Sequence, residues 1–418
     1  MIDNSEIEER VILVAVSSSE NDNTKQSLDE LEELADTAGA VTAAKVIQNR
    51  EKVHPGTYIG KGKIQEVKEM ILQYDATGII CDDELSPAQM ANLQDELETK
   101  VMDRTLLILD IFAAHATSGE GKIQVELAQL RYRATRLVGL RNSLSRLGGG
   151  IGTRGPGETR LEMDRRLIHD RIGQLKRELD EVVTHRELTR SQRKRNGIPV
   201  AAIVGYTNAG KSTLLNYLTG AGVLSENKLF ATLDPTTRNL ELDNGQQVLV
   251  SDTVGFISKL PHQLVEAFKS TLEEASYADI IIHVVDCSNP QMDSQMHVVY
   301  ETLNQLKAGD KPIITAFNKC DMEGADMTAR DLRADETVRI SALTGQGIDT
   351  LKSAIENVLR KSRVYIEKTF GYNDAGTVAT IRKYGQLVSE EYTGEGISVK
   401  AYVPAYVYDR INDSGEQK

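Results

Sequence analysis

Short apolar runs alternate with helical patterns through the first hundred residues of the chain. The runs predict strands at residues 11–16, 44–47 and 78–81, and the patterns predict helices at 28–38, 63–73 and 87–98. Ser86 directly precedes the last helix as an N-terminal cap. We therefore expect a small α/β layer. Within it, the turn from His54 to Gly62 is either structural or a second anion site.

The next hundred residues carry two apolar stripes at helical spacing. The first comprises Ile123, Leu127, Leu130, Ala134 and Leu137, and the second comprises Leu161, Ile168, Ile172, Leu175, Leu179 and Val182. We expect them to pack as an antiparallel hairpin, whose second helix spans up to ~55 Å at 1.5 Å per residue. Glycines at 148–150, 152, 155 and 157 predict an irregular loop over residues 146–160.

The remaining sequence predicts a second α/β domain followed by a small α+β appendage. Strands are expected at 200–204, 248–250, 313–317 and 338–340, with helices at 213–218 and 351–359. The tail predicts strands at 364–370, 386–392 and 397–402, a helix at 375–384, and disorder beyond Ile411. We predict four domains, at residues 1–104, 105–196, 197–362 and 363–418.

A phosphate-binding loop follows the predicted strand at 200–204. Its Gly-x-x-x-x-Gly-Lys-Ser spacing lets a strand turn sharply into a helix while backbone N–H groups point at a β-phosphate. Lys211 then brings a charge to the β- and γ-phosphates, and Ser212 offers a hydroxyl to Mg²⁺. We expect the whole loop to contact nucleotide: Gly205, Tyr206, Thr207, Asn208, Ala209, Gly210, Lys211 and Ser212. An accidental glycine-rich turn is the alternative.

A second motif predicts guanine as the base. It follows the apolar run at 313–317 and comprises Asn318, Lys319, Cys320 and Asp321. The Asp321 carboxylate can accept from both the N1–H and the exocyclic amine of guanine, whereas adenine would leave that charge unpaired. The remaining base-contacting loop is expected at Ser341, Ala342 and Leu343.

Two segments between these motifs are candidates for sensing the γ-phosphate. The clearer one comprises Asp252, Thr253, Val254 and Gly255. Asp252 is expected to hold Mg²⁺ through water, and the Gly255 amide to meet the γ-phosphate. The other comprises Phe230, Ala231, Thr232, Leu233 and Asp234. Thr232 is the favoured second hydroxyl ligand of Mg²⁺, with Thr236 and Thr237 as rivals.

The residue after Gly255 bears on the rate of hydrolysis. Phe256 stands where GTPases of the Ras type carry the glutamine that orients the attacking water. Unaided hydrolysis is therefore expected to be slow until a partner surface or a bound cation completes the site. Asn208 is similar to the asparagine of GTPases that coordinate K⁺ near the phosphates, so K⁺ is a second cofactor hypothesis. The candidate catalytic residues are Lys211, Asn208 and Gly255.

Composition bounds the class of protein. Apolar residues make up 40% of the 418 residues, with no run of eighteen, and the acidic start is not typical of a signal peptide. We expect a cytoplasmic protein and leave loose membrane association open. Cys81, Cys287 and Cys320 stand far apart in the sequence, which predicts reduced, unpaired thiols and no structural metal.

Charge is unevenly distributed along the chain. The formal net charge is −13, yet residues 131–196 hold 17 Lys and Arg against 8 Asp and Glu. We call the predicted hairpin with its basic, glycine-rich loop at residues 146–160 the finger. Such a segment can bind between the phosphate backbones of a structured RNA. The alternative is a solvated helix pair that ends in an idle loop.

Taken together, these residues resemble the HflX GTPases. The resemblance rests on the phosphate loop with Asn208, on residues 230–234 and 252–256, and on Gly-Thr-Arg-Gly-Pro-Gly-Glu-Thr at 152–159, and it covers nearly the whole chain. It implies an α/β P-loop GTPase domain with an N-terminal α/β domain, a helical hairpin linker and a small C-terminal α+β domain. It also implies GTP hydrolysis, with Ser212 and Thr232 on Mg²⁺.

The same resemblance implies a partner, the large (50S) ribosomal subunit. The N-terminal domain and finger would lie on ribosomal RNA near the peptidyl transferase centre, and the family is linked to separating stalled ribosomes under stress. The expected mechanism is a switch, because loss of the γ-phosphate releases Thr232 and Gly255. We expect a monomer. The alternatives are a GTPase switch for a protein or membrane partner, and a nucleotide enzyme acting on RNA through its N-terminal domain.

Overall fold

The computed structural model describes residues 8–18, 23–147, 156–195, 198–220, 229–230, 236–243, 245–259, 274–361, 363–404, 407–408 and 411. These residues form two compact units. The first takes in the described residues up to 183 together with 229–230 and 258–259, and the second takes in the others. The division into four domains made from the sequence stays a prediction.

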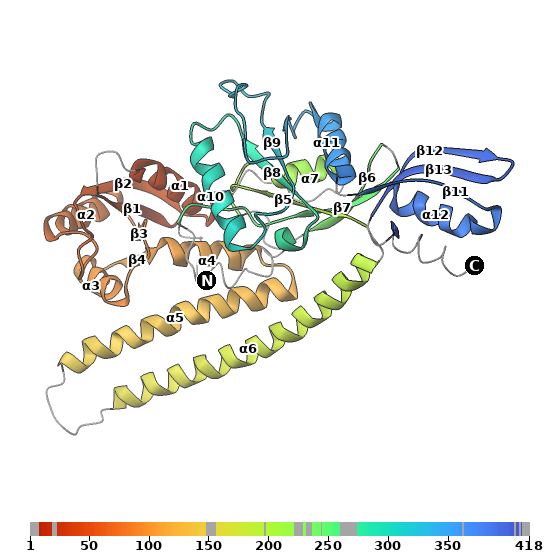
Figure 1. Cartoon of the computed structure of the whole chain (residues 1–418). Helices are drawn as coiled ribbons and strands as arrows, with labels where there is room; N and C mark the ends of the chain where they lie inside the picture. The colour runs from red at the N-terminus through yellow and green to blue at the C-terminus, as the bar shows by residue number, and fades with distance from the viewer. Residues whose placement is uncertain are drawn as a thin grey trace, which may run out of the picture. The chain divides into compact units, whose positions relative to one another are not determined.

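The first unit is built on a four-stranded parallel sheet in the order β2-β1-β3-β4 (Figure 1). Its strands are β1 (Arg10–Ser17), β2 (Val41–Asn49), β3 (Gly78–Cys81) and β4 (Lys100–Asp103). The core of β1 is an unbroken apolar run, and residues 11–15 are buried, as a strand with both faces covered requires. The three predicted strands are confirmed, and β4 had not been predicted.

Three amphipathic helices connect these strands: α1 (Thr24–Thr37), α2 (Lys61–Tyr74) and α3 (Pro87–Leu97). The predicted cap is confirmed, because Ser86 accepts from the Gln89 backbone while the Gln89 side chain accepts from the Ser86 backbone. In the turn before α2, His54 Nδ1 accepts from the Gly56 and Thr57 amides at 3.2 and 3.1 Å. These donors serve the turn itself, which favours its structural interpretation.

Helix α4 (Arg104–His115) was not expected from the sequence. It is apolar over most of its length and seven of its twelve residues are buried, so it lacks the stripe by which an amphipathic helix is found. Its N-terminus is capped by Asp103, which accepts from the Leu106 amide at 2.9 Å. The same fully buried carboxylate accepts from the Leu85 amide, the Tyr132 hydroxyl and the Arg136 guanidinium at 3.1, 2.8 and 2.8 Å.

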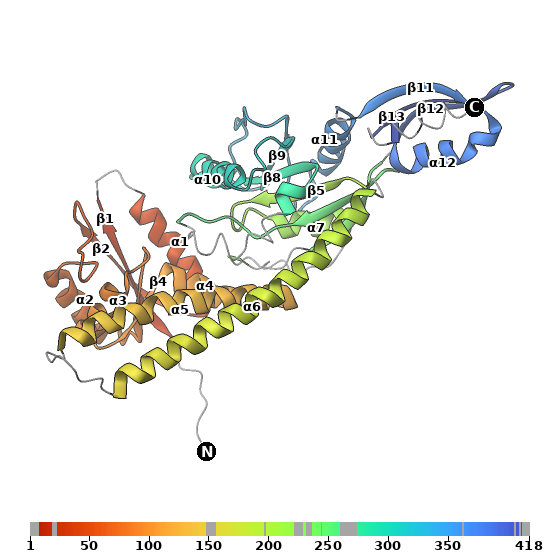
Figure 2. The same ribbon diagram turned by 60° about the horizontal axis from the view of Figure 1, so that its bottom comes forward.

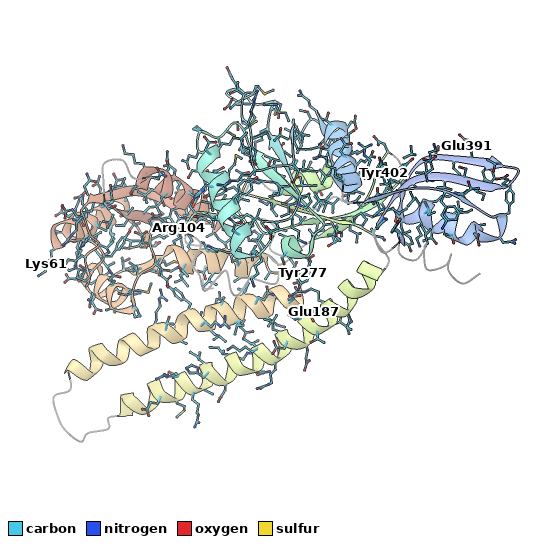
Figure 3. All side chains as sticks on the ribbon, viewed as in Figure 1. Lys61, Arg104, Glu187, Tyr277, Glu391 and Tyr402 are labelled. Atoms are coloured by element: carbon cyan, nitrogen blue, oxygen red, sulfur yellow. The ribbon has the colours of Figure 1, made fainter. Side chains whose placement is uncertain are left out.

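A buried ion cluster lies around Arg104, which is labelled in Figure 3. Its guanidinium contacts Glu30 at 2.5 Å and Asp82 at 2.8 Å, and donates to the Ser258 carbonyl oxygen at 3.2 Å. Lys259 adds ion pairs to Asp82 and, at 2.7 Å, to Asp83. Burial raises the pKa of Asp82, but the two cations outweigh it and hold that pKa below its usual value.

Helices α5 (Gly119–Leu147) and α6 (Pro156–Arg195) run side by side in opposite directions (Figures 1 and 2). Leu127, Ile172 and Leu175 are buried where the two helices meet. They are flanked by Ile123, Leu130, Ala134, Ile168 and Leu179. The predicted packing of the two stripes is confirmed at these positions, while the side chains of Leu137 and Leu161 lie outside the description.

The loop predicted between the two helices is wrong at both of its ends. We expected a loop over residues 146–160, but α5 continues to Leu147 and α6 begins at Pro156 with Gly157 in its first turn. Proline suits the first helical position, where its missing N–H costs nothing. Residues 148–155 lie outside the described ranges. With 40 residues, α6 is about 60 Å long at 1.5 Å per residue.

The second unit contains a six-stranded sheet in the order β10-β9-β8-β5-β7-β6, in which only β6 runs antiparallel to its neighbour. Its strands are β5 (Val200–Gly205), β6 (Thr237–Glu241), β7 (Gln247–Asp252), β8 (Ile280–Asp286), β9 (Ile313–Asn318) and β10 (Glu336–Arg339). Its helices are α7 (Lys211–Thr219), α10 (Met292–Gln305) and α11 (Ile348–Lys361). The strands and helices predicted here are confirmed; β6, β8 and α10 had not been predicted.

The C-terminal segment forms a three-stranded antiparallel sheet in the order β11-β13-β12. It comprises β11 (Val364–Phe370), a short 3-10 turn, α12 (Ala375–Tyr384), β12 (Gln386–Thr393) and β13 (Gly396–Val403). Tyr402, labelled with Glu391 in Figure 3, lies 5.2 Å from Tyr365 between ring centroids. The predicted α+β appendage is confirmed. Residues 412–418, expected to be disordered, lie outside the described residues. Within the described ranges, no helix has the length and apolar character needed to cross a membrane.

The Asp103 cluster gives a test of the first unit's stability. Asp103→Ala should lower the free energy of unfolding by about 3–5 kcal/mol, because it removes the α4 cap and takes the nearer carboxylate from the largely buried Arg136 guanidinium. Chemical denaturation of the full chain measures the change. Asp95→Ala, at an exposed position on α3, is the matched control and should change stability by less than about 0.5 kcal/mol. Equal stabilities for the two variants would contradict the assignment.

Candidate functional site

The predicted phosphate loop lies between β5, which ends at Gly205, and α7, which begins at Lys211. The chain turns through two left-handed residues, Asn208 with φ 59° and Gly210 with φ 95°. A Cβ on Gly210 would lie 2.3 Å from Asn318 Nδ2. Both the backbone angle and this close approach therefore require glycine at position 210.

Lys211 places its charge inside the protein. The side chain is 7% exposed, and Nζ donates to the Tyr206 carbonyl oxygen at 2.7 Å. Burial lowers the pKa of Lys211 to about 8, although the Asp252 carboxylate acts in the opposite direction. An ammonium group that has already been desolvated is ready to pair with an incoming anion such as a phosphate.

Ser212 and Asp252 meet beside this lysine. Asp252 is fully buried at the end of β7, and its Oδ2 accepts from the Ser212 hydroxyl at 2.8 Å. Hydroxyl and carboxylate oxygens are the ligands that Mg²⁺ prefers, usually one or two from protein with the rest from water and substrate phosphates. Within the described ranges, no group of three or more His, Cys, Asp or Glu residues could hold a metal ion. The pair therefore fits Mg²⁺ bound together with a nucleotide.

Gly255 closes the other side of the phosphate loop. A Cβ there would lie 2.9 Å from Lys211 Nζ and 2.8 Å from Thr207 Cγ2, so any side chain would crowd the lysine. Phe256 exchanges backbone hydrogen bonds with the loop, accepting from the Thr207 amide at 2.8 Å and donating to the Gly205 carbonyl at 3.1 Å. Its ring is 1% exposed and packs in the core. The Thr207 hydroxyl is buried without a hydrogen-bond partner among the described residues, so a bound ligand would satisfy it.

Asn318 connects three of the predicted loops. Its Nδ2 donates to the Ala209 carbonyl at 2.8 Å, and its Oδ1 accepts from the Ala342 amide at 2.9 Å. The side chain is 2% exposed. The nitrogen and the oxygen of the Asn318 amide are therefore both hydrogen-bonded. These two bonds fix the spacing of three segments: the phosphate loop, the 318–321 motif and the 341–343 loop.

The remaining base-site candidates differ in their exposure. Lys319 pairs with Asp286 at 2.6 Å, and Asp321 is exposed. Ser341 is buried, whereas Leu343 is 78% exposed. The structure thus brings the 205–212, 252–255, 318–321 and 341–343 segments to one edge of the sheet. Their contacts with nucleotide stay predictions.

The predicted segment 230–234 is not tested as part of this site. Ala231, Thr232, Leu233 and Asp234 lie outside the described residues. Phe230 belongs to the first unit, where its ring lies 4.7 Å from the Phe112 ring. The choice of Thr232 over Thr236 and Thr237 as a Mg²⁺ ligand therefore stays a prediction.

The strand β8 and the functional residue at its end were not predicted from the sequence. Asp286, which holds Lys319, terminates the apolar run 280–285, and recognising that run as a strand would have identified the residue. Cys287 follows it and lies 3.6 Å from Cys320, measured between the two Sγ atoms. The cysteines that are far apart in the sequence are therefore neighbours here, because Asp286 on β8 and Asn318 on β9 are paired in register. Both thiols are free.

Three family models match the chain. Residues 25–113 match a model described as GTP-binding GTPase N-terminal, and residues 115–193 match one described as GTP-binding GTPase Middle Region. Residues 200–319 match a model described as 50S ribosome-binding GTPase. Together these models span most of the chain.

Whole-chain relatives agree with the models. The chain is 66% identical to the GTPase HflX of Lacrimispora saccharolytica over 416 residues, covering 100% of this chain and 98% of the relative. It is 50% identical to the GTPase HflX of Caldanaerobacter subterraneus subsp. tengcongensis, covering 97% and 93% of the two chains. A solved GTP-binding protein from the archaeon Sulfolobus solfataricus, in complex with GDP, is 25% identical with a TM-score of 0.45, covering 84% and 99%. On the strength of the full-length relatives, the chain belongs to the HflX family of GTPases and is an enzyme that binds and hydrolyses GTP.

Proposed function

We propose that this GTPase is a switch that binds the large ribosomal subunit in its GTP form and leaves it after hydrolysis, acting in rescue or splitting of stalled ribosomes. The observation that carries the proposal is a basic two-helix hairpin encoded next to a GTPase domain whose family model is described as 50S ribosome-binding. The proposed site of action is cytoplasmic, and a monomeric state stays a prediction.

In this proposal the sheet edge is the nucleotide site. The 205–212 loop holds the phosphates, the 318–321 and 341–343 loops hold guanine, and Asp321 selects that base. Ser212 holds Mg²⁺ directly, with Thr232, and Asp252 holds it through water; the metal neutralises phosphate charge. The Ser212 to Asp252 contact of 2.8 Å and the buried Lys211 ammonium support this assignment.

Slow unaided hydrolysis follows from the residue after Gly255. The Phe256 ring is 1% exposed and carries no polar atom, so it cannot orient a water molecule at the γ-phosphate. The Gly255 amide is proposed to sense the γ-phosphate, since the space beside Lys211 is open only to a residue without a side chain. A ribosomal surface, or a K⁺ ion held near Asn208, then has to complete the catalytic site.

The hairpin is proposed to engage ribosomal RNA. The region 131–196 holds 17 Lys and Arg against 8 Asp and Glu, in a chain whose formal net charge is −13. The α5 and α6 stripes pack on each other through Leu127 and Leu175, which leaves their polar faces outward. Such a surface contacts backbone phosphates, and its affinity falls steeply as salt rises.

The buried lysine predicts a pH dependence of nucleotide affinity. Without nucleotide, Lys211 loses its proton above about pH 8, and a bound phosphate raises its pKa, so binding above that pH requires proton uptake. The GDP affinity should be flat from about pH 7 to 8 and then fall by up to about tenfold per pH unit. Calorimetry measures it. Lys211→Ala should abolish binding, whereas any binding by Lys211→Arg should lack this pH step. A flat wild-type profile to pH 9 would contradict the role of Lys211.

Asp321 gives a test of base selection. Asp321→Ala should lower the GDP affinity by about 10–100-fold and leave ADP binding unchanged, because only guanine uses that carboxylate. Calorimetry with both diphosphates measures the selectivity. Glu323→Ala removes an exposed carboxylate two residues further along the same loop and should retain it. Equal affinity of the parent chain for GDP and ADP would overturn the guanine assignment.

Purified large ribosomal subunits test the partner. They should raise GTP turnover by orders of magnitude, since the Phe256 loop cannot position water alone. Removing residues 147–157 should leave GDP affinity intact and reduce both stimulation and co-sedimentation with the subunit, and the parent's binding should weaken steeply with salt. A deletion variant that sediments as the parent does would refute the finger proposal.

The same turnover assay tests whether K⁺ is a cofactor. Run in matched KCl and NaCl buffers, it should give faster turnover in KCl if K⁺ sits near Asn208. Identical rates would remove K⁺ from the mechanism and leave the ribosome as the completing surface.

A further inference from the structure

Two cysteines meet beside the proposed base site. Cys287 directly follows β8, and Cys320 is the third residue of the 318–321 motif after β9. Because Asp286 pairs with Asn318 in the parallel ladder, the two strands deliver both side chains to the same place. Their Sγ atoms are 3.6 Å apart, and neither is in a disulfide.

We propose that Cys287 and Cys320 form a reversible disulfide whose formation displaces Asp321 and weakens guanine nucleotide binding. The inference rests on the proposed role of the 318–321 motif in base recognition. It adds an oxidative modification site to that motif.

The surroundings of the pair tolerate this bond. The Cys287 thiol donates to the Asn318 carbonyl at 2.9 Å and the Cys320 thiol donates to the Phe317 carbonyl at 3.2 Å. Both donations end when the thiol protons leave. Each carbonyl nevertheless keeps a backbone donor, since Cys287 N bonds to Asn318 O and Ile340 N bonds to Phe317 O. Oxidation therefore leaves no buried acceptor without a partner.

The two thiols differ in exposure to solvent, and this difference determines which of them reacts first with an oxidant. Cys287 is 2% exposed in a cluster with Val285 and Phe317, whereas Cys320 is partly exposed at the edge of that cluster. Burial, with the neighbouring Cys320 thiol, raises the pKa of Cys287 to about 12, so Cys287 stays a thiol at neutral pH. Cys320 is thus the residue that meets an oxidant, and Cys287 resolves it.

A peroxide is the class of oxidant that reacts in this order, first with Cys320 and then, through the sulfenic acid, with Cys287. The Cys320 thiolate attacks one peroxide oxygen and the O–O bond breaks, which gives a Cys320 sulfenic acid and, after proton uptake, one water. Cys287 then attacks Cys320 Sγ, loses its proton, and displaces hydroxide as a second water. The two thiols lose two electrons, which reduce one hydrogen peroxide to two waters. A dithiol reverses the bond by exchange and becomes a disulfide itself.

Closing the bond requires movement of the loop. A disulfide holds its sulfurs about 2.05 Å apart, so the present separation has to shrink by roughly 1.5 Å. Cys287 is held at the end of β8 by two backbone hydrogen bonds, from its amide to Asn318 at 3.1 Å and from the Asp326 amide to its carbonyl at 2.8 Å, whereas the Cys320 amide makes one such bond, to Ile340 at 3.2 Å. Cys320 therefore moves, and Asp321, its chain neighbour, moves with it. At reaction centres a misplacement of ~1 Å costs up to about a hundredfold in rate, and a displaced carboxylate likewise loses the hydrogen bonds that give it affinity for a base.

The test compares reduced and peroxide-treated full-length protein. Non-reducing peptide mass spectrometry should detect a Cys287–Cys320 crosslink, and calorimetry should show GDP affinity reduced by about tenfold or more, with recovery on adding a dithiol. Absence of the crosslink, or a crosslinked protein with unchanged GDP affinity, would overturn the proposal. If the reduced protein did not bind GDP, that result would count against the proposed function instead. Formation of the crosslink can still be measured in that case, because mass spectrometry detects it without nucleotide.

Matched variants assign the effect to this pair. Cys287→Ser keeps a donor to the Asn318 carbonyl, so it should bind GDP as the reduced parent does and ignore peroxide. Cys81→Ala removes the third, fully buried thiol and should respond to peroxide as the parent does. If Cys287→Ser does not fold, Cys320→Ser replaces it, and this variant should not form the crosslink. A peroxide response that persists in the serine variant would place the modification elsewhere and refute the inference.

Discussion

The spacing of the site's loops depends on one buried amide, that of Asn318. Its nitrogen bonds the phosphate loop at Ala209 and its oxygen bonds the 341–343 loop at Ala342, while Gly210 is bare so that it can approach. A primary amide carries its donor and its acceptor on two separate atoms, so it can bond two backbone groups that lie apart. Asp or Leu at this position would leave a buried backbone group unpaired. The loops predicted to contact base and phosphate are therefore held together by a single side chain.

Sheet topology explains why these loops gather. The segments at 205–212, 252–255, 318–321 and 341–343 all follow parallel strands, and the carboxyl ends of such strands share one edge of a sheet. The same rule brings Asp286 to Lys319 and Cys287 to Cys320, although each pair is more than thirty residues apart. Burial then gives these neighbours their chemistry: it lowers the pKa of the Lys211 ammonium and raises that of the Cys287 thiol.

The sequence predicted what short-range spacing determines. The turn from β5 into α7, the Ser86 cap and the stripes of α5 and α6 each rest on residues close together in the sequence. It did not predict α4, which is buried on most sides and so has no stripe, nor the start of α6, where proline outweighs the adjacent glycine. It also missed the cysteine pair, because proximity across a parallel ladder depends on which strands are neighbours. Strand order is a tertiary property that no local pattern encodes.

The ion pairs of Lys259 have a mechanical consequence. Only three residues separate Gly255 from Lys259, a span of at most ~14 Å when fully extended. Lys259 is held by Asp82 and Asp83 at the end of β3, and Ser258 by Arg104. When residues 256–258 are fully extended, any further movement of Gly255 must either break the ion pair between Lys259 and the buried Asp82 or move the residues that follow β3. Residues 256–258 thus join Gly255 to a point of the chain that is held by ion pairs, at Lys259.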